Sequence, residues 1–517
     1  MQPEWLKLKR YPHIGKPLKS SDIGWIKAYV TNPGNIIRHK FTPLLNRVIT
    51  QRKFRPKENA PKNKSGKRLR TFIENKKRKI YFPSHLDSII YSYYNYILSN
   101  AYEKYLSDKD FSSAVVAYRK IPKNSMIEGN KCNIEFAADA FQFITNNKHR
   151  KLSVIIADVS SFFDNLDHRL IHQQWKEVLG VDDLPKDHYK IYKSLVDYKY
   201  VKECQLFNHF KNRLIVERNK PNDTKEKVLK RKRVGNIHNM RHENVVSFCY
   251  AEEFFKEATH LIKVNKPFNK ALRLKLDKEE KKGIPQGTPL SATLANIYMI
   301  EFDAKIHEES TKFSRNAFYQ RYSDDIIIIC DLKDEIYFEE LIRNEITKKA
   351  HLQIQESKTN IYRYELTGSS LKGGIVKSNN THTTKQLEYL GFVFDGERVL
   401  VKSSGFSRFF RNMKHAFKKG TLYAKKTHIP SNALFERRLY KRFTHIGAKR
   451  KLKYIADPNN PDKFKKTTMY DWGNYISYLN KANAVMKEIN KTDCITKQAR
   501  KIWKKFHALK RLFIHCK

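Results

Sequence analysis

Two adjacent aspartates, Asp324 and Asp325, are the feature that most constrains how this chain folds. Residues 317–322 (AFYQRY) precede them and four isoleucines at 326–329 follow them, so β-branched and aromatic residues stand on both sides. Neighbouring side chains diverge along a strand, so a tight turn is needed to bring the two carboxylates together. We therefore expect a hairpin of two buried strands whose negatively charged tip favours a bound cation. For this stretch alone, an ordinary exposed turn is the alternative.

A third carboxylate, Asp158, follows the apolar run LSVIIA at residues 152–157, which predicts a buried strand. Three acidic side chains suffice to hold two divalent cations about 4 Å apart, because phosphate and water oxygens complete the coordination. The sequence thus predicts that Asp158 lies beside the Asp324–Asp325 hairpin tip. For Asp158 taken alone, the favoured interpretation is the N-cap of a helix that follows the strand.

A loop of glycine and proline at residues 283–291 (GIPQGTPLS) leads into an apolar helix that begins at Ser291. A loop followed by a helix N-terminus can lie against a nucleotide and its templating base. A simple junction between loop and helix is the alternative.

The charge balance indicates a polyanionic partner. The 517 residues include 102 Lys and Arg against 53 Asp and Glu, a formal net charge of +49. Nucleic acid is favoured, because each neutralised phosphate also releases counterions. A membrane surface is disfavoured, since no apolar stretch reaches the length of a spanning helix. The N-terminus has no apolar signal core, and the six cysteines form no C-x-x-C pair, so we expect a cytoplasmic protein with reduced thiols.

Three motifs occur in order: Asp-x-x-x-x-Phe-Asp at 158–164, Pro-Gln-Gly at 285–287 and Tyr-x-Asp-Asp at 322–325. On these residues the chain resembles a reverse transcriptase over about residues 70–400. The resemblance implies an RNA-directed DNA polymerase, a nucleotidyltransferase. It also implies an α+β right-hand fold, with fingers, an antiparallel palm sheet, a helical thumb and a basic α-helical C-terminal region. We expect an N-terminal extension at 1–50, fingers and palm at 51–400 with an insertion at about 200–280, and the thumb and C-terminal region at 401–517. Residue patterns predict a short strand at 78–82, helices at 84–106 and 335–350, a strand at 352–364 and a hairpin at 386–402. The Lys-rich stretch at 218–233 is expected to be exposed, and residues 1–50 show no clear period.

The resemblance also implies a role for each matching residue. Asp158, Asp324 and Asp325 are expected to bind two Mg²⁺ ions, which Mn²⁺ can replace, with help from the carbonyl of Val159. Asp164 lies past the family's ligand position and is expected either to be structural or to support the metal ligands from behind. The remaining roles are nucleotide binding by Arg78, Phe163, Gln286 and Gly287, proton donation by Lys358, and a primer grip at Tyr389, Leu390 and Gly391.

Three of these roles have a physical reason and an alternative. A bulky ring at Phe163 would clash with a ribose 2′ hydroxyl and favour deoxynucleotides; core packing is its alternative. The guanidinium of Arg78 offers fixed paired donors to a triphosphate, a role that Lys76 could take instead. Lys358 would protonate the leaving pyrophosphate, or it is a solvated surface lysine.

Basic side chains outside the motifs are expected to contact nucleic acid. These are Lys67, Arg68 and Arg70 in the basic segment 51–80, and Lys504 and Lys505 near the C-terminus. Residues 497–517 place an apolar face opposite such lysines, which predicts a docked basic helix.

Other positions bear on the biological role. The stretch AYRK at 117–120, QGTPLS at 286–291 and Ser323 resemble the bacterial defence-associated, abortive-infection-like group. No carboxylate series of a ribonuclease H domain and no endonuclease motif was found. We therefore expect an enzyme that copies a noncoding RNA into DNA from dNTPs in antiphage defence, with self-association left open. The alternatives are a mobile-intron maturase or reverse transcriptase, and an RNA-dependent RNA polymerase. Priming from a tyrosine hydroxyl (Tyr470, Tyr475 or Tyr478) is also open.

Overall fold

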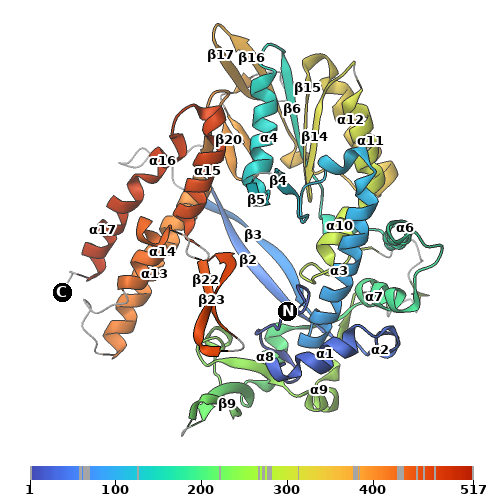
Figure 1. Cartoon of the computed structure of the whole chain (residues 1–517), viewed down its shortest axis with the longest axis vertical. Coiled ribbons are helices and arrows are strands. Elements are labelled where there is room, and N and C mark those ends of the chain that lie inside the picture. Colours follow the sequence, from blue (N-terminus) through green and yellow to red (C-terminus); the bar gives the residue numbers. More distant parts are fainter. Residues whose placement is uncertain are drawn as a thin grey trace. The chain divides into compact units, whose positions relative to one another are not determined.

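The computed structural model describes residues 3–56, 61, 70–124, 127–220, 223–265, 268–269, 274–275, 282–312, 314–376, 382–383, 385–427, 436–449, 452–457, 460–470 and 473–514 (Figure 1). The chain divides into two compact units. The first unit comprises Met1–Tyr118, Val159–His307 and Ile342–Gln355, and the second comprises Arg119–Asp158, Glu308–Leu341 and Glu356–Lys517. Both units mix helices and strands, which confirms the expected α+β class. Among the described residues, no helix combines the length and apolarity needed to cross a bilayer.

An antiparallel sheet of six strands organises the second unit. Its order is β14 (Phe318–Tyr322), β15 (Asp325–Asp331), β6 (Leu152–Asp158), β16 (Asn360–Thr367), β17 (Ser370–Val376) and β18 (His382–Thr383). The four isoleucines of β15 are fully buried, because the central strand is covered on both faces. The predicted strand at 152–157 and the predicted hairpin are confirmed. The strand expected at 352–364 was wrong at its start, since a 3₁₀ turn at Glu356–Lys358 delays β16 to Asn360.

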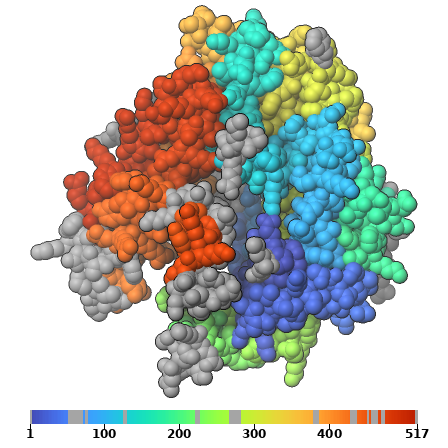
Figure 2. Space-filling model, viewed as in Figure 1, coloured from blue at the N-terminus to red at the C-terminus, as the bar shows by residue number. Residues whose placement is uncertain are grey.

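A second, smaller sheet follows, with three strands where the sequence predicted a hairpin over residues 386–402. These are β19 (Leu387–Tyr389), β20 (Phe392–Phe394) and β21 (Val399–Val401). The helices of this region are α4 (Asn133–Asn146), α13 (Ser403–Thr427), α14 (Glu436–Phe443), α15 (Tyr475–Asn490), α16 (Cys494–Ala499) and α17 (Lys501–Ile514). One hydrophobic cluster joins both sheets, α4 and the C-terminal helices. Figure 2 shows the surface of α15 beside that of α4, in agreement with their packing.

The C-terminal region is not helical throughout. A hairpin of β22 (Leu452–Asp457) and β23 (Asn460–Tyr470) interrupts the expected helices. The last helix matches its prediction, since Ile502, Phe506 and Leu509 of α17 are buried whereas Lys504 and Lys505 are exposed.

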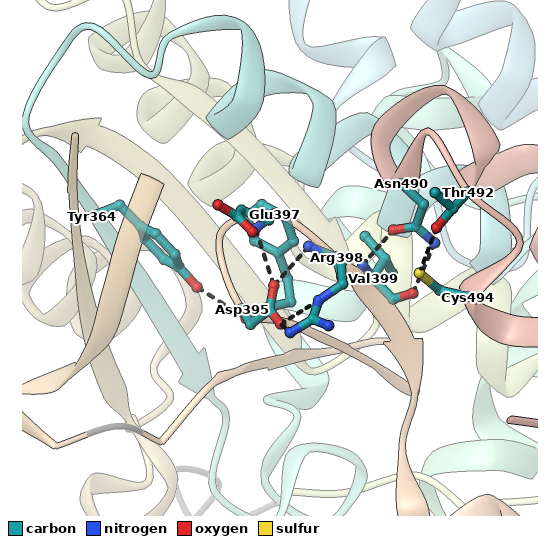
Figure 3. Close-up of polar contacts among 9 residues, drawn as sticks. Tyr364, Asp395, Glu397, Arg398, Val399, Asn490, Thr492 and Cys494 are labelled. Carbon is teal, nitrogen blue, oxygen red and sulfur yellow. Dashed lines mark hydrogen bonds and ion pairs between the residues drawn. The ribbon is translucent and has the colours of Figure 1, made fainter. Parts of the chain in front are cut away.

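Two side-chain amides complete the free edge of β21. Asn490 Oδ1 accepts from the N–H of Val399 at 2.6 Å, and Asn490 Nδ2 donates to the carbonyl of Val399 at 3.0 Å (Figure 3). Gln498 does the same for Val401, with distances of 3.0 and 3.3 Å. Residues two apart on a strand direct their backbone groups to the same edge. The C-terminal helices thus hold the small sheet through backbone hydrogen bonds as well as apolar contact.

In the first unit, two long antiparallel strands carry the basic segment. The sheet order is β11 (Lys263–Val264), β7 (Lys199–Lys202), β2 (Leu44–Pro56) and β3 (Arg70–Phe82). The short strand predicted at 78–82 is therefore the end of a longer one. Helix α3 (His85–Ser107) follows as predicted, and the Ser84 hydroxyl caps its N-terminus by accepting from the N–H of Asp87.

The predicted insertion forms a sheet with its own core. Strands β1 (His13–Ile14), β10 (Val245–Cys249), β8 (Leu214–Lys220) and β9 (Asp223–Lys232) lie in that order. The exposed Lys-rich stretch at 218–233 is thus mostly a hairpin, and the N-terminal segment, unassigned from sequence, contributes a strand. The other elements of this unit include α1 (Ile23–Val30), α2 (Pro33–Arg38), α5 (Phe162–Asn165), α6 (His168–Leu179), α7 (Lys186–Val196), α8 (Glu203–Phe210), α9 (Ala251–Glu257) and α10 (Ser291–Tyr298). Helices α11 (Ile300–Thr311) and α12 (Glu335–Ala350) each span the division between the units, and α12 confirms the helix predicted at 335–350.

Candidate active site

The turn between β14 and β15 carries the aspartate pair. Ser323 adopts a left-handed backbone conformation (φ 63°), which closes the turn. Arg321, fully buried, donates from Nη1 to the carbonyl of Ser323 at 3.0 Å and so supports that conformation. On the other side of β15, Asp325 pairs directly with Asp158 at the end of β6. Three strand ends therefore bring Asp158, Asp324 and Asp325 to one edge of the sheet.

The electrostatics of this edge suit a cation. Burial, together with the charges of Asp324 and Asp158, raises the pKa of Asp325 to about 6, against the opposing charges of Lys358 and Lys402. Carboxylates that repel each other in a partly buried site are stabilised by a hard divalent ion, and their oxygens are the ligands that Mg²⁺ prefers. The donor chemistry of the three residues therefore fits the predicted metal.

Lys358 supplies the positive charge found beside Asp158. Its Nζ lies 2.5 Å from Asp158 Oδ1. Among the described residues, no three His, Cys, Asp or Glu side chains are already gathered as a ligand cluster. A metal ion bound at Oδ1 of Asp158 would replace its contact with Lys358. The metal-ligand roles of the three aspartates, and the role of Lys358 as a proton donor, stay predictions.

The predicted primer-grip residues line a cavity together with Asp325. Its volume is about 470 Å³. The other lining residues are Asn133, Ile156, Tyr322, Glu388, Tyr389, Leu390, Gly391 and Lys402. Leu390 and Gly391 both have positive φ (43° and 92°), which forms the tight turn between β19 and β20. The structure thus brings this turn and the aspartate edge to one cavity.

Two polar pairs hold this turn in place, and the sequence did not indicate them. The Tyr389 hydroxyl donates to Gln320 Oε1 at 2.9 Å, and burial, with the charge of Asp325, raises the pKa of Tyr389. Lys402 Nζ lies 2.5 Å from Glu388 Oε2. Partners so far apart in the chain leave no local pattern, although the alternation of residues 387–394 does indicate which of them face inward.

The predicted nucleotide-binding residues lie in the first unit, where three segments adjoin. The N–H of Ile284 donates to the carbonyl of Phe163 at 2.9 Å, which joins α5 to the glycine–proline loop. The N–H of Tyr81 donates to the carbonyl of Gln286 at 2.9 Å, which joins the same loop to β3. Phe162 is buried whereas the ring of Phe163 is half-buried. Phe163 is thus the ring of this pair that a ligand can reach.

Gly287 is required where the loop meets β3. Its φ is +118°, and an added Cβ would lie 2.8 Å from both Ile80 Cγ2 and the carbonyl oxygen of Tyr81.

Arg78, two residues before Ile80, is exposed on β3. Val159 is buried and bridges Ile354.

Some of the other predicted residues lie outside the part of the chain that the structure describes. Lys67 and Arg68 lie outside the described residues, as does the side chain of Arg70. Asp164 is exposed in α5, and its backbone carbonyl would meet a Cβ added to Gly283. Because that contact involves the backbone alone, the role expected for the Asp164 side chain stays a prediction.

Residues 253–394 match the family model described as reverse transcriptase (RNA-dependent DNA polymerase). The match includes the glycine–proline loop, Asp324, Asp325, Lys358 and the Tyr389 turn, and Asp158 precedes it. No curated protein matches the sequence.

Solved telomerases are among the similar structures. Telomerase from Candida albicans with a fragment of telomeric RNA shares 14% identity and a TM-score of 0.34, over 76% of this chain and 52% of that one. Apo telomerase from Candida tropicalis, truncated from its C-terminal domain, shares 10% identity and a TM-score of 0.36, over 76% and 64%. The chain thus spans about half to two-thirds of the length of these structures. The family relationship rests on the match at residues 253–394, which are similar to a reverse transcriptase (RNA-dependent DNA polymerase) domain.

Proposed function

We propose that the chain copies RNA into DNA by two-metal nucleotidyl transfer at Asp158, Asp324 and Asp325. The observation that carries the proposal is the pairing of Asp325 with Asp158 across adjacent strands, with Asp324 in the turn beside them. Reverse transcriptases use divalent metals such as Mg²⁺. When bound, the ions would activate the primer 3′ hydroxyl and neutralise charge on the triphosphate.

The protein's own groups position the substrates. The primer end would lie in the cavity shared by Asp325 and the turn at Tyr389, Leu390 and Gly391. The incoming dNTP would contact Gln286 and Gly287, with Arg78 on its phosphates. The half-buried ring of Phe163 would exclude a 2′ hydroxyl. Lys358 would leave Asp158 as metal binds, and its ammonium would then be free to donate a proton to pyrophosphate.

We propose a noncoding RNA as the template and antiphage defence as the setting. The support is the resemblance at residues 117–120, 286–291 and Ser323. Exposed Lys504 and Lys505 on α17 offer phosphate contacts for such an RNA. Sequencing of nucleic acid that co-purifies with the protein tests this part. Recovery of cDNA matching one host-encoded RNA supports it, whereas cDNA from unrelated cellular RNAs contradicts it.

The chemistry is tested by replacing Asp324 and Asp325 with Ala. Incorporation of dNTPs on a primed RNA template should fall by at least about 10³-fold, because both metal positions lose ligands. RNA binding should persist, since it depends on basic residues elsewhere. As a matched control, Asp331→Ala removes a carboxylate from the far end of the same strand. Undiminished synthesis in the double variant would refute the site assignment.

A further inference from the structure

A cavity of about 820 Å³ in the first unit shares no residue with the sites proposed above. Its walls come from separated parts of the chain: residues 10–12, residues 46–48 of β2, residues 202–204 between β7 and α8, and residues between 237 and 245. Its dimensions suit a small ligand held on several sides.

Asn46 offers this cavity a hydrogen-bond donor that the protein does not satisfy. The residue is 5% exposed, and among the described residues its Nδ2 has no hydrogen-bond partner. Asn46 lies in the middle of the sheet, paired with Tyr81 of β3 and with Lys202 of β7. Its backbone is therefore held between two neighbouring strands. Because a buried N–H without an acceptor is unfavourable, a ligand with an acceptor at this position would stabilise the site.

The cavity carries an excess of positive charge. Arg10, Lys202 and Arg241 line it and are exposed. The lining carboxylate, Glu203, is already neutralised, because Arg47 donates to its two oxygens from Nε at 2.6 Å and from Nη2 at 2.5 Å. Guanidinium and ammonium groups in excess over carboxylates favour a phosphate-bearing ligand.

An aromatic ring completes the set of contacts. Tyr11 lines the cavity, and its hydroxyl donates to the carbonyl of Pro83 at 2.7 Å, which fixes the ring. The rings of Phe82 and His85 lie 5.6 and 5.4 Å from it and support it further. A fixed aromatic ring at a basic site is a common platform for an unpaired base.

We infer that this cavity binds one nucleotide, with its phosphate at Arg10, Lys202 and Arg241 and an acceptor of its base at Asn46 Nδ2. Inorganic phosphate alone would leave the Asn46 amide without an acceptor and most of the cavity empty. A base-paired nucleotide does not suit the cavity, because the Watson–Crick edge of its base is already hydrogen-bonded to another base. Either a free nucleoside monophosphate or an unpaired nucleotide of an RNA strand presents the required groups. The inference does not depend on the polymerase assignment, since it uses none of those residues.

Cys204 provides a direct test, because this exposed cysteine lines the cavity. The full-length protein is treated with N-ethylmaleimide in EDTA, which removes metal-dependent nucleotide binding at the aspartates. Peptide mass spectrometry then gives the alkylation rate of Cys204, with half-buried Cys494 as the internal reference. The probes are the four nucleoside 5′-monophosphates, a short unstructured RNA and inorganic phosphate. A nucleotide at ten times its dissociation constant should slow the reaction of Cys204 by about tenfold and leave Cys494 unchanged.

Two substitutions that remove the same charge make the test specific. Arg241→Ala, on the cavity, should abolish the protection, whereas Arg38→Ala, on exposed α2, should retain it. Asn46→Ala should weaken nucleotide protection in the same assay. Protection by monophosphates identifies a free nucleotide as ligand, and protection by RNA alone identifies an RNA strand. The inference is overturned if neither protects, if inorganic phosphate protects as well as nucleotides do, or if Arg241→Ala behaves like Arg38→Ala.

Discussion

The Nζ of Lys358 lies 2.5 Å from Oδ1 of Asp158, so a lysine contacts the carboxylate that we propose as a metal ligand. Lys358 is partly exposed, and the interaction is accordingly worth no more than about 1 kcal/mol. A metal ion can displace it readily. Without metal, the ammonium of Lys358 balances the charge of Asp158. We propose that the same lysine donates a proton to pyrophosphate once metal has replaced it.

Lys358→Met should therefore raise the affinity of the protein for Mn²⁺ by about threefold, because the ion no longer competes with the ammonium. Isothermal titration in the absence of nucleotide measures this affinity. Lys372→Met, on neighbouring β17, removes an exposed charge without touching Asp158 and should change nothing. An unchanged affinity in Lys358→Met would show that the lysine does not compete with metal.

Replacement of Phe163 by Val should relax the choice of sugar. If the half-buried ring excludes the 2′ hydroxyl, the preference for dNTPs over rNTPs should fall by roughly 100-fold, measured as a ratio of kcat/KM values. The adjacent Phe162 is buried in the core, so Phe162→Val should lower stability and leave the preference unchanged. Equal preference in the wild type and Phe163→Val would assign Phe163 to core packing.

Gly287→Ala should displace the loop from β3. The added methyl group would lie 2.8 Å from Ile80 Cγ2 and from the carbonyl oxygen of Tyr81, and the loop must shift to relieve both contacts. A displaced Gln286 should raise the KM for dNTPs by roughly tenfold. Gly235→Ala is the control, because its added Cβ meets nothing within 4 Å. A normal KM in Gly287→Ala would contradict a role for this loop in nucleotide binding.

Stability should decrease in mild acid because of His13. Burial, together with the charge of His85, lowers its pKa from the ordinary 6.5 to about 4. Between these values the unfolded chain binds the proton more readily, so the stabilisation is present above pH 6.5 and is lost as the pH falls toward 4. The shift corresponds to roughly 3 kcal/mol.

Urea unfolding of the wild type and His13→Gln, between pH 4 and 7, measures this contribution. The variant should lose less free energy of unfolding over that range, whatever its stability at pH 7. His149→Gln, at an exposed turn, should follow the wild type. Parallel pH profiles for the wild type and His13→Gln would show that His13 titrates normally.

The amides on β21 should contribute to stability. Asn490→Ala leaves the N–H and carbonyl of Val399 without partners and should lower the free energy of unfolding by about 1–3 kcal/mol. Asn480→Ala, on the exposed face of the same helix, should cost well under 1 kcal/mol. Thermal unfolding compares the two variants, and equal losses would contradict the proposed contribution.

Much of the second unit's sheet could be predicted from sequence because its signals are local. The isoleucine run of β15 and the apolar run of β6 are each too long and too apolar for an exposed loop. Asp325 marks the start of β15 and Asp158 the end of β6. Helices α3 and α12 place apolar residues three or four positions apart, as in Tyr91, Tyr94 and Leu98 and in Phe338, Ile342 and Ile346. The strand expected from residue 352 failed because the 3₁₀ turn at Glu356–Lys358 consumes residues whose composition also suits a strand.

Other features could not be predicted, since no local pattern encodes them. Frequent lysines and arginines in β3 interrupt the alternation of apolar and polar residues by which a long strand is predicted. The hairpin β22–β23 lacks a clear alternation for the same reason. In the site, the motifs identify Asp158, Asp324 and Asp325 individually. The contacts of Lys358 with Asp158 and of Tyr389 with Gln320 depend on partners far apart in the chain, which only the fold brings together.

The amides of Asn490 and Gln498 have a consequence for solubility. An unpaired strand edge offers a template on which a strand from another molecule can add, and this is a common start of aggregation. At Val399 and Val401, side chains from the C-terminal helices already satisfy the backbone groups that a foreign strand would need. Loss of those helices would expose an apolar edge as well as remove a basic surface. Chains truncated before residue 490 should therefore tend to self-associate through this strand.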